Sequence, residues 1–182
     1  MIELEEGGAA AARPGAAKPP PALVRWTEAL SALCGRLTSL LAVALAAGFI
    51  GCLLLQVISR YVFNAPLSWS DEAAIFLFAW MIMLVASLGV RERFHVRLTF
   101  FLTRLPRRLQ DALNFLFLVA ITAFGGVLVV EGMDLVGLVW GDTSPAIQYP
   151  AEALYLATPI SGCLIVVHGI AALLKDATGG TR

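Results

Sequence analysis

The side chains in this sequence that could take part in chemistry are two histidines, two adjacent carboxylates and three cysteines. The histidines are His95 and His168, and two imidazoles near one membrane face could ligate haem iron or relay protons. His95 lies outside every long apolar segment, which favours interpreting His168 as a histidine hydrogen-bonded within packed helices. A haem-bearing or structural membrane anchor for another complex stays open as an alternative.

The adjacent carboxylates Asp71 and Glu72 have the residue types of an acid–base pair, but neighbouring residues on a helix point about 100° apart. They therefore do not converge on one substrate, and we expect no catalytic dyad. Cys34, Cys52 and Cys163 are odd in number and form no CxxC motif, which indicates neither a disulfide framework nor a zinc site. The sequence thus predicts no catalytic, cofactor-binding or metal-binding residues, and a protein that is not an enzyme.

The composition is typical of a membrane protein. Hydrophobic residues make up 59% of the 182 residues and charged residues 14%, whereas soluble domains carry about 25% charged residues. The net charge of zero provides no basic field for nucleic acid, so no such partner is expected. A helix needs about 20 apolar residues to cross a hydrocarbon core about 30 Å thick. Charge-free stretches near that length cover residues 37–59, 73–90, 112–130 and 153–174, and they predict an all-α protein with four transmembrane helices.

Lysine and arginine are distributed unevenly around these four stretches. Four of them precede the first stretch, one follows it, six lie between the second and third, none lies between the third and fourth, and two follow the fourth. Cytoplasmic segments of membrane proteins carry an excess of these residues. The pattern therefore places both termini and the second connection in the cytoplasm, and predicts a multi-pass protein of the bacterial inner membrane.

The segments outside the spans differ in composition. Residues 1–22 combine glutamates, an Ala/Gly run and consecutive prolines, and we interpret them as a disordered tail. The four-helix domain is expected over residues 23–176, and residues 177–182 form a C-terminal tail. Apolar residues recur at helical spacing in residues 22–35 and 98–105, which predicts two short amphipathic helices on the membrane surface. An ordinary basic loop is the alternative for the second of them.

Several residues within the spans are expected to shape helix packing. Pro159 cannot donate a backbone hydrogen bond to the Tyr155 carbonyl, so the fourth span should kink there. A discontinuous substrate-binding helix is the alternative interpretation. Gln56 is expected to hydrogen-bond across a helix interface or to lie near the headgroups. Gly48, four residues after Ala44, is small enough to permit close approach of a neighbouring helix.

The segment from residue 60 to residue 95 carries the most specific expectations. Trp69 is expected at headgroup depth, and Glu72 in the first turn of the second span, where a carboxylate meets the positive end of the helix dipole. Trp80 lies in mid-span, and its indole N–H needs an acceptor, which predicts helix packing rather than lipid contact. Arg60 ends the first span on the same side as Glu72, and its expected partner is Glu72, another subunit or solvent.

The order and spacing of residues in this segment resemble the small membrane subunit of tripartite ATP-independent periplasmic (TRAP) transporters, the DctQ-type family. The resemblance covers about residues 23–176 and includes the four spans. It is carried by the run Arg60-Tyr61-Val62-Phe63-Asn64, followed by Trp69, Glu72, Trp80, Gly89 and His95. By resemblance, Arg60 and the five residues that follow the run belong to a family motif or a subunit interface.

The resemblance implies a chain that supports transport. In such systems a periplasmic binding protein captures an organic acid, such as a dicarboxylate, and a large DctM-type permease subunit moves it inward using an ion gradient. The small subunit packs against the large one within membrane lipid and steadies it. Acidic residues of the outer connections are expected to help dock the binding protein; they are Glu131, Asp134, Asp142 and Glu152.

A self-sufficient small transporter, acting as a homodimer of four-helix chains, is the remaining alternative. Such a protein would need a membrane-embedded carboxylate to couple transport to ions, and the four charge-free stretches hold none. Transporter cores also show paired helix interruptions, whereas Pro159 provides a single one. These two features favour the supporting role.

Overall fold

The computed structural model describes residues 22–92 and 106–177, and within these two ranges the secondary structure consists of helices without strands. The helices are α1 (Ala22–Tyr61), α2 (Ser68–Arg91), α4 (Arg107–Leu138), α5 (Ala151–Tyr155) and α6 (Ala157–Ala177). His95, the predicted surface helix over residues 98–105 and most of both predicted tails lie outside the described residues.

Four helical segments are long and apolar enough to cross a membrane. They run from Trp26 to Tyr61, Ser68 to Arg91, Leu109 to Leu138 and Ala151 to Asp176, and the last of them includes both α5 and α6. This result confirms the prediction of an all-α protein with four transmembrane helices. The helices follow the predicted order along the chain, but they extend beyond the charge-free stretches.

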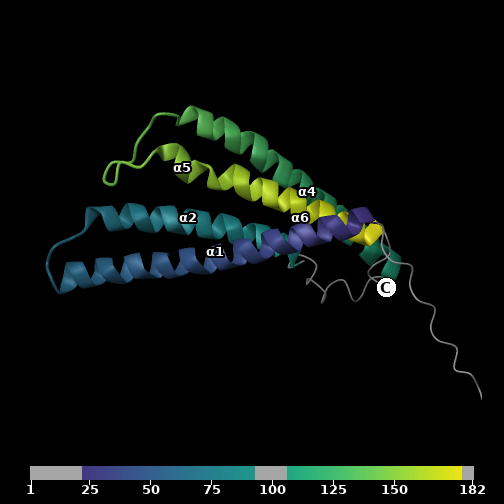
Figure 1. Ribbon diagram of the computed structural model, residues 1–182, viewed down its shortest axis with the longest axis horizontal. Coiled ribbons are helices and arrows are strands. Elements are labelled where there is room, and N and C mark those ends of the chain that lie inside the picture. Colours follow the sequence, from purple (N-terminus) through teal and green to yellow (C-terminus); the bar gives the residue numbers. More distant parts are fainter. Residues whose placement is uncertain (1–21, 93–105, 178–182) are drawn as a thin grey trace, which may run out of the picture.

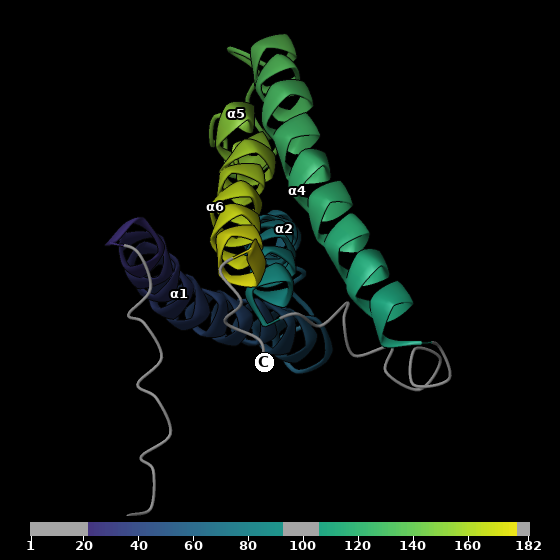
Figure 2. The same ribbon diagram turned by 90° about the vertical axis from the view of Figure 1, so that its right-hand side faces the viewer.

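The spans form an open layer rather than a closed bundle. In Figure 1, α1 lies beside α2 and α4 packs on α6, while α6 also contacts both α1 and α2. Figure 2 shows α1 and α4 on opposite sides of the central pair formed by α2 and α6. In the most apolar stretch of the fourth span, which includes α5 and α6, 44% of the residues are buried, against 6% in the span of α1 and 11% in that of α4. The outer faces of α1 and α4 are therefore apolar surfaces available to lipid or to another membrane chain.

Glycines bring α4 and α6 into direct backbone contact. A Cβ atom on Gly162 would lie 2.8 Å from the carbonyl oxygen of Gly125, and one on Gly125 would lie 2.6 Å from the side chain of Ile165. Small residues at a helix crossing permit such close approach. The adjacent Gly126 faces open space, so the two neighbouring glycines of α4 have different surroundings.

The first span is part of a single helix, α1, which has 40 residues and is about 60 Å long at 1.5 Å per residue. The segment 22–35, which the sequence predicts as a short surface helix, continues into the span without a break. Ser31 and Gly35 within that segment are buried, because they face α6 and α2. Further along, Gly48 lies against Leu77 of α2, as expected for a small residue at a helix contact.

The third span continues past its predicted end at residue 130, because α4 runs to Leu138. The predicted span ends before Glu131 because a charge is costly inside the hydrocarbon. A charged residue does not, however, end a helix. Glu131 and Asp134 are both exposed on the last turns of α4. The connection between α4 and α5 is consequently shorter than the sequence suggests and covers residues 139–150.

The fourth span is interrupted where Pro159 predicts a kink. α5 ends at Tyr155 and α6 begins at Ala157, with Leu156 between them in a right-handed helical conformation. The Leu156 N–H donates to the Glu152 carbonyl and the Ile160 N–H to the Leu156 carbonyl, so α5 and α6 form one interrupted span. Gly132 of α4 makes room for the proline ring, since a Cβ atom there would lie 2.8 Å from Pro159 Cδ.

Candidate functional site

A carboxylate of α2 fastens the connection between α4 and α5 to the start of α2. Glu72 accepts a hydrogen bond from the Ser144 hydroxyl at 2.7 Å. It also accepts hydrogen bonds from the backbone N–H groups of Ala146 and Ile147, at 2.8 and 2.9 Å. Hydrogen bonds to an ionised carboxylate are shorter and stronger than those between neutral groups. We call this arrangement of Glu72, Ser144, Ala146 and Ile147 the Glu72 clamp.

Hydrogen bonds within the connection hold the backbone N–H groups of Ala146 and Ile147 toward Glu72. The Ser144 N–H donates to the Tyr149 carbonyl at 3.0 Å, and the Ala151 N–H donates to the Asp142 carbonyl at 2.8 Å. Between these two contacts, Gln148 has a φ of 61°, in the left-handed region that few residues other than glycine adopt. The connection is thus a folded turn whose exposed N–H groups point toward α2.

An aromatic contact adds to the attachment of this connection. The Tyr149 ring packs edge-on against Phe76 of α2, with the two ring centroids 5.2 Å apart. Burial raises the pKa of the Tyr149 hydroxyl, and the negative charge of Glu72 raises it further. The ring contact and the hydrogen bonds to Glu72 thus attach the same connection to α2.

The structure places the other motif residues apart from the clamp. Arg60 is exposed, and the Glu72 carboxylate binds the connection instead of Arg60. Trp69 is 42% exposed at the start of α2, where an interfacial aromatic is expected. Gly89 faces open space, so contacts among the described residues do not require a glycine there. His95 lies outside the described residues.

Trp80 joins α2 to the interrupted span. Its indole N–H donates to the carbonyl oxygen of Ala153 at 3.0 Å, and its ring lies 6.3 Å from that of Phe76. Ala153 is in α5, which ends at Tyr155, and carbonyls in the last turn of a helix lack helical donors. Trp80 satisfies one of these carbonyls, which confirms that its indole is used for helix packing.

Replacing Trp80 by phenylalanine should remove this hydrogen bond while keeping an aromatic ring in place. We expect a loss of about 1 kcal/mol in the free energy of unfolding, because the Ala153 carbonyl is left without its donor. Thermal unfolding of the purified protein in detergent measures the change. Trp140→Phe is the matched control, since Trp140 is 74% exposed. Equal changes in the two variants would contradict a role for the hydrogen bond.

Two further polar contacts join helices within the layer. Gln56 of α1 donates to the Asp71 carboxylate of α2, which confirms the expected hydrogen bond across a helix interface. His168 is 1% exposed, and its Nδ1 lies 2.8 Å from the Ser31 hydroxyl oxygen. This contact confirms the interpretation of His168 as a histidine hydrogen-bonded within packed helices. Among the described residues, no group of three His, Cys, Asp or Glu side chains is arranged to hold a metal ion.

Residues 49–179 match the family described as tripartite ATP-independent periplasmic transporters, DctQ component. The match begins within α1 and includes α2, α4, α5 and α6, so it covers most of the chain. The chain belongs to the DctQ family. It is accordingly a multi-pass protein of the inner membrane, in agreement with its four apolar helices.

Three relatives show the range of proteins to which the chain is similar. The C4-dicarboxylate TRAP transporter small permease protein DctQ of Vibrio cholerae is 32% identical over 100 residues, which are 53% of this chain and 43% of the relative. The sialic acid TRAP transporter small permease protein SiaQ of the same species is 27% identical over 103 residues, which are 57% of this chain and 60% of the relative. The isethionate TRAP transporter permease protein DctMQ of Oleidesulfovibrio alaskensis is 30% identical over 116 residues, which are 63% of this chain and 18% of the relative. The chain thus spans less than two thirds of each of these relatives.

Proposed function

We propose that the chain is the small permease subunit of a TRAP transporter that imports an organic acid. In this proposal it supports a large DctM-type permease subunit, which receives the substrate from a periplasmic binding protein. The observation that carries the proposal is the DctQ family match over residues 49–179. The relatives are named for a C4-dicarboxylate, sialic acid and isethionate, all organic acids, so a dicarboxylate is one candidate substrate among several.

The positions of the acidic side chains favour a scaffold over an independent transporter. Asp71 and Glu72 lie at the start of α2, and Glu131 and Asp134 lie on the last turns of α4. Asp71 and Glu72 also have partners within the chain, namely Gln56 and the α4–α5 connection. A coupled transporter uses carboxylates deep in the membrane, facing a substrate or ion path. The helix-end positions found here suit a structural subunit.

The outer faces of α1 and α4 are the surfaces that we propose a large membrane subunit and lipid cover. Exposed apolar residues on them include Leu40, Val43 and Leu54 of α1 and Leu116, Phe124 and Val127 of α4. Elements of the large subunit would then move against a layer fixed by the glycine contact between α4 and α6 and by the Glu72 clamp. The name DctMQ of one relative supports an association of this kind.

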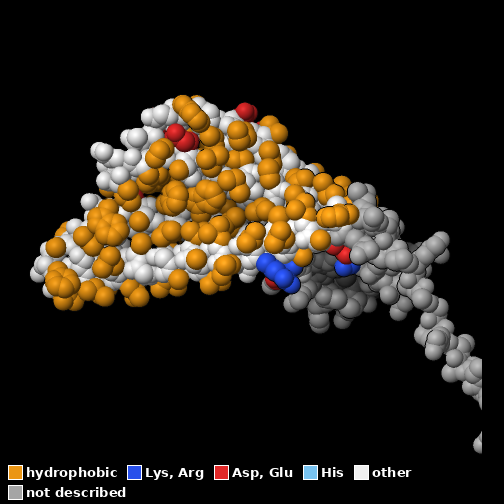
Figure 3. Space-filling model, in the orientation of Figure 1, with side chains coloured by type: hydrophobic (Ala, Val, Ile, Leu, Met, Phe, Trp, Pro, Cys, Tyr) orange, Lys and Arg blue, Asp and Glu red, His pale blue; other side chains and the backbone are white. Residues whose placement is uncertain are grey.

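We also propose that acidic residues near the outer end of the layer help dock the binding protein. Glu131, Asp134 and Asp142 are exposed, whereas Glu152 is half-buried. Figure 3 shows some acidic side chains on the surface over α4, away from the basic side chains, and others beside the basic side chains at the opposite end of the layer. A variant in which all four carboxylates are replaced by their uncharged amides should dock the binding protein more weakly than the native chain. Unchanged docking would remove this proposal.

Affinity purification of the tagged chain from its native membrane tests the proposed function. We expect a much larger polytopic membrane protein to co-purify, and organic-acid uptake to require both proteins together with the binding protein. Uptake by the purified chain alone in vesicles would overturn the proposal in favour of a self-sufficient transporter.

The proposed orientation, with both termini in the cytoplasm, can be tested in the same strain. Single cysteines in the arginine-rich connection between α2 and α4, placed in a cysteine-free background, should resist a membrane-impermeant thiol reagent in intact cells. Labelling of these cysteines from the periplasm would show that the orientation is the reverse of the proposed one.

A further inference from the structure

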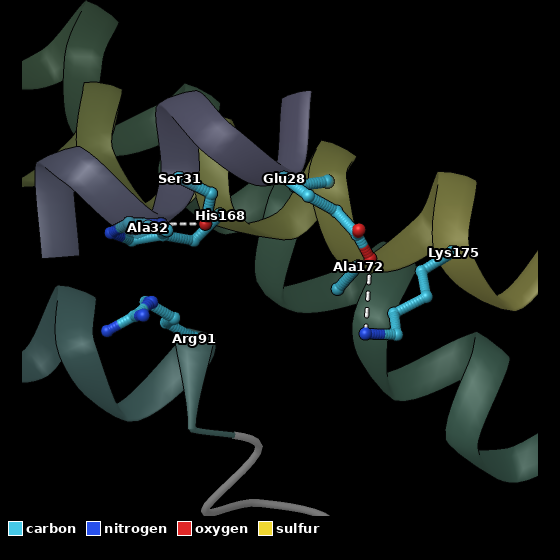
Figure 4. Close-up of a pocket in the computed structure, with 8 residues that line it drawn as sticks. Glu28, Ser31, Ala32, Arg91, His168, Ala172 and Lys175 are labelled. Carbon is cyan, nitrogen blue, oxygen red and sulfur yellow. Dashed lines mark hydrogen bonds and ion pairs between the residues drawn. The ribbon is translucent and has the colours of Figure 1, made fainter. Parts of the chain in front are cut away.

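A polar cavity lies where the N-terminal part of α1 meets the C-terminal ends of α2 and α6. Its volume is about 240 Å³. Figure 4 shows its charged and polar side chains, which come from all three helices: Glu28, Ser31, Arg91, His168 and Lys175. None of them belongs to the Glu72 clamp or to the acidic group Glu131, Asp134, Asp142 and Glu152.

A buried histidine nitrogen in the wall of this cavity lacks a hydrogen-bond partner. His168 is 1% exposed, and Nδ1 is bound to the Ser31 hydroxyl, but Nε2 has no partner among the described residues. When the Ser31 hydroxyl donates to Nδ1, Nε2 carries the proton and is a donor. A buried donor without an acceptor is costly, so such groups are normally satisfied by a ligand or by water.

An arginine lies beside the histidine. Arg91 is the last residue of α2, and its guanidinium group rests on α1 at Gly35, where a Cβ atom would lie 2.5 Å from Nη1. The glycine therefore makes room for the arginine across α1. Glu28 and Lys175 form an ion pair of 3.1 Å at the other side of the cavity, which leaves Arg91 as a positive charge in excess. Guanidinium groups favour phosphate and carboxylate oxygens.

The position of the cavity along α1 indicates the source of its ligand. Arg91 and Lys175, which line the cavity, are the charged residues that end the second and fourth charge-free stretches. Because such charges are costly inside the hydrocarbon, the cavity is at the depth of lipid headgroups. Ala32, Ala171 and Ala172 also line the cavity and add apolar surface to it.

We propose that this cavity binds a phosphate group, and that the phosphate belongs to a membrane phospholipid. Arg91 neutralises the phosphate, and the Nε2 proton of His168 donates to one of its oxygens. Free inorganic phosphate has the same chemistry but lacks the acyl chains, so the two sources can be separated by experiment. This inference does not depend on the proposed transport function.

Native mass spectrometry of the full chain, delipidated in a mild detergent, tests the proposal. The added probes are phosphatidylglycerol, phosphatidylethanolamine, diacylglycerol and inorganic phosphate. We expect one phospholipid per chain to bind, and diacylglycerol and inorganic phosphate to bind much more weakly. Arg91→Gln should weaken phospholipid binding about tenfold, because one charge-assisted interaction is lost. Arg36→Gln is the matched control, since Arg36 is exposed on α1 near the cavity but does not line it.

A second variant separates the geometry of the site from its charge. Gly35→Ala retains every charge but displaces the Arg91 side chain, so it should also weaken phospholipid binding several-fold. Circular dichroism confirms that each variant keeps its helices. Equal losses in Arg91→Gln and Arg36→Gln, or equal binding of diacylglycerol, would overturn the phosphate site. Inorganic phosphate that binds as tightly as the phospholipid would overturn the lipid assignment.

Discussion

Glu72→Ala is expected to release the connection between α4 and α5 from α2. The carboxylate accepts three hydrogen bonds from residues 139–150, and the alanine side chain accepts none. We therefore expect the amides of Ala146 and Ile147 to exchange with deuterium about tenfold faster or more, because local opening no longer breaks charge-assisted hydrogen bonds. Hydrogen–deuterium exchange of the connection, followed by mass spectrometry, measures this change directly.

Two variants separate the charge of Glu72 from its shape and from acidity in general. Glu72→Gln keeps one acceptor oxygen, so its effect on exchange should be intermediate. Glu131→Ala removes an exposed carboxylate of α4 and should leave exchange of the connection unchanged. Protection of Ala146 and Ile147 in Glu72→Ala equal to that in the native chain would show that the clamp does not hold the connection.

The positions of the spans were predictable because the cost of burying charge is a local property of sequence. Residues 73–90 fall within α2, and residues 153–174 fall within α5 and α6. Helix ends were less predictable, as the continuation of α4 beyond Glu131 shows. A charged residue limits how deeply a helix is inserted, but the helix can continue into the headgroup region or beyond.

The partners of the motif residues were not predictable in the same way. That Trp80 needs an acceptor follows from its indole N–H, but the acceptor is a backbone carbonyl 73 residues away. The partners of Glu72 are likewise a serine and two backbone amides more than 70 residues away. Backbone groups carry no residue type, so only the folded connection shows where they point. The sequence identified these residues as needing partners, and tertiary structure supplies the partners.

The pair Gly125-Gly126 illustrates the same division between sequence and structure. Both residues are helical glycines in mid-span, and nothing in their types distinguishes them. Helix geometry rotates adjacent residues about 100° apart, so one of them can face α6 while the other does not. In the packing of α4 on α6, Gly125 is the glycine that contacts α6, so substitutions at the two positions should have different effects on stability.

Gly162→Ala should separate the backbones of α4 and α6. The added methyl group would lie 2.8 Å from the Gly125 carbonyl oxygen, and that oxygen belongs to a helix backbone that cannot rotate away. We expect a loss of about 2–3 kcal/mol in the free energy of unfolding from the resulting strain. Gly125→Ala meets the buried Ile165 side chain at 2.6 Å and should also destabilise the protein. Unfolding in detergent, monitored by circular dichroism, compares both variants with the native chain.

Gly126→Ala is the internal control, because its added methyl group meets no atom within 4 Å. Alanine is favoured over glycine within a helix by about 1 kcal/mol, so this variant should be neutral or stabilising. The three variants add the same methyl group to helical glycines of the same layer, and two of them are adjacent in sequence. A difference in sign between Gly125→Ala and Gly126→Ala can therefore come only from what each glycine faces. If all three variants were equally stable, the close contact between α4 and α6 would not hold the layer together.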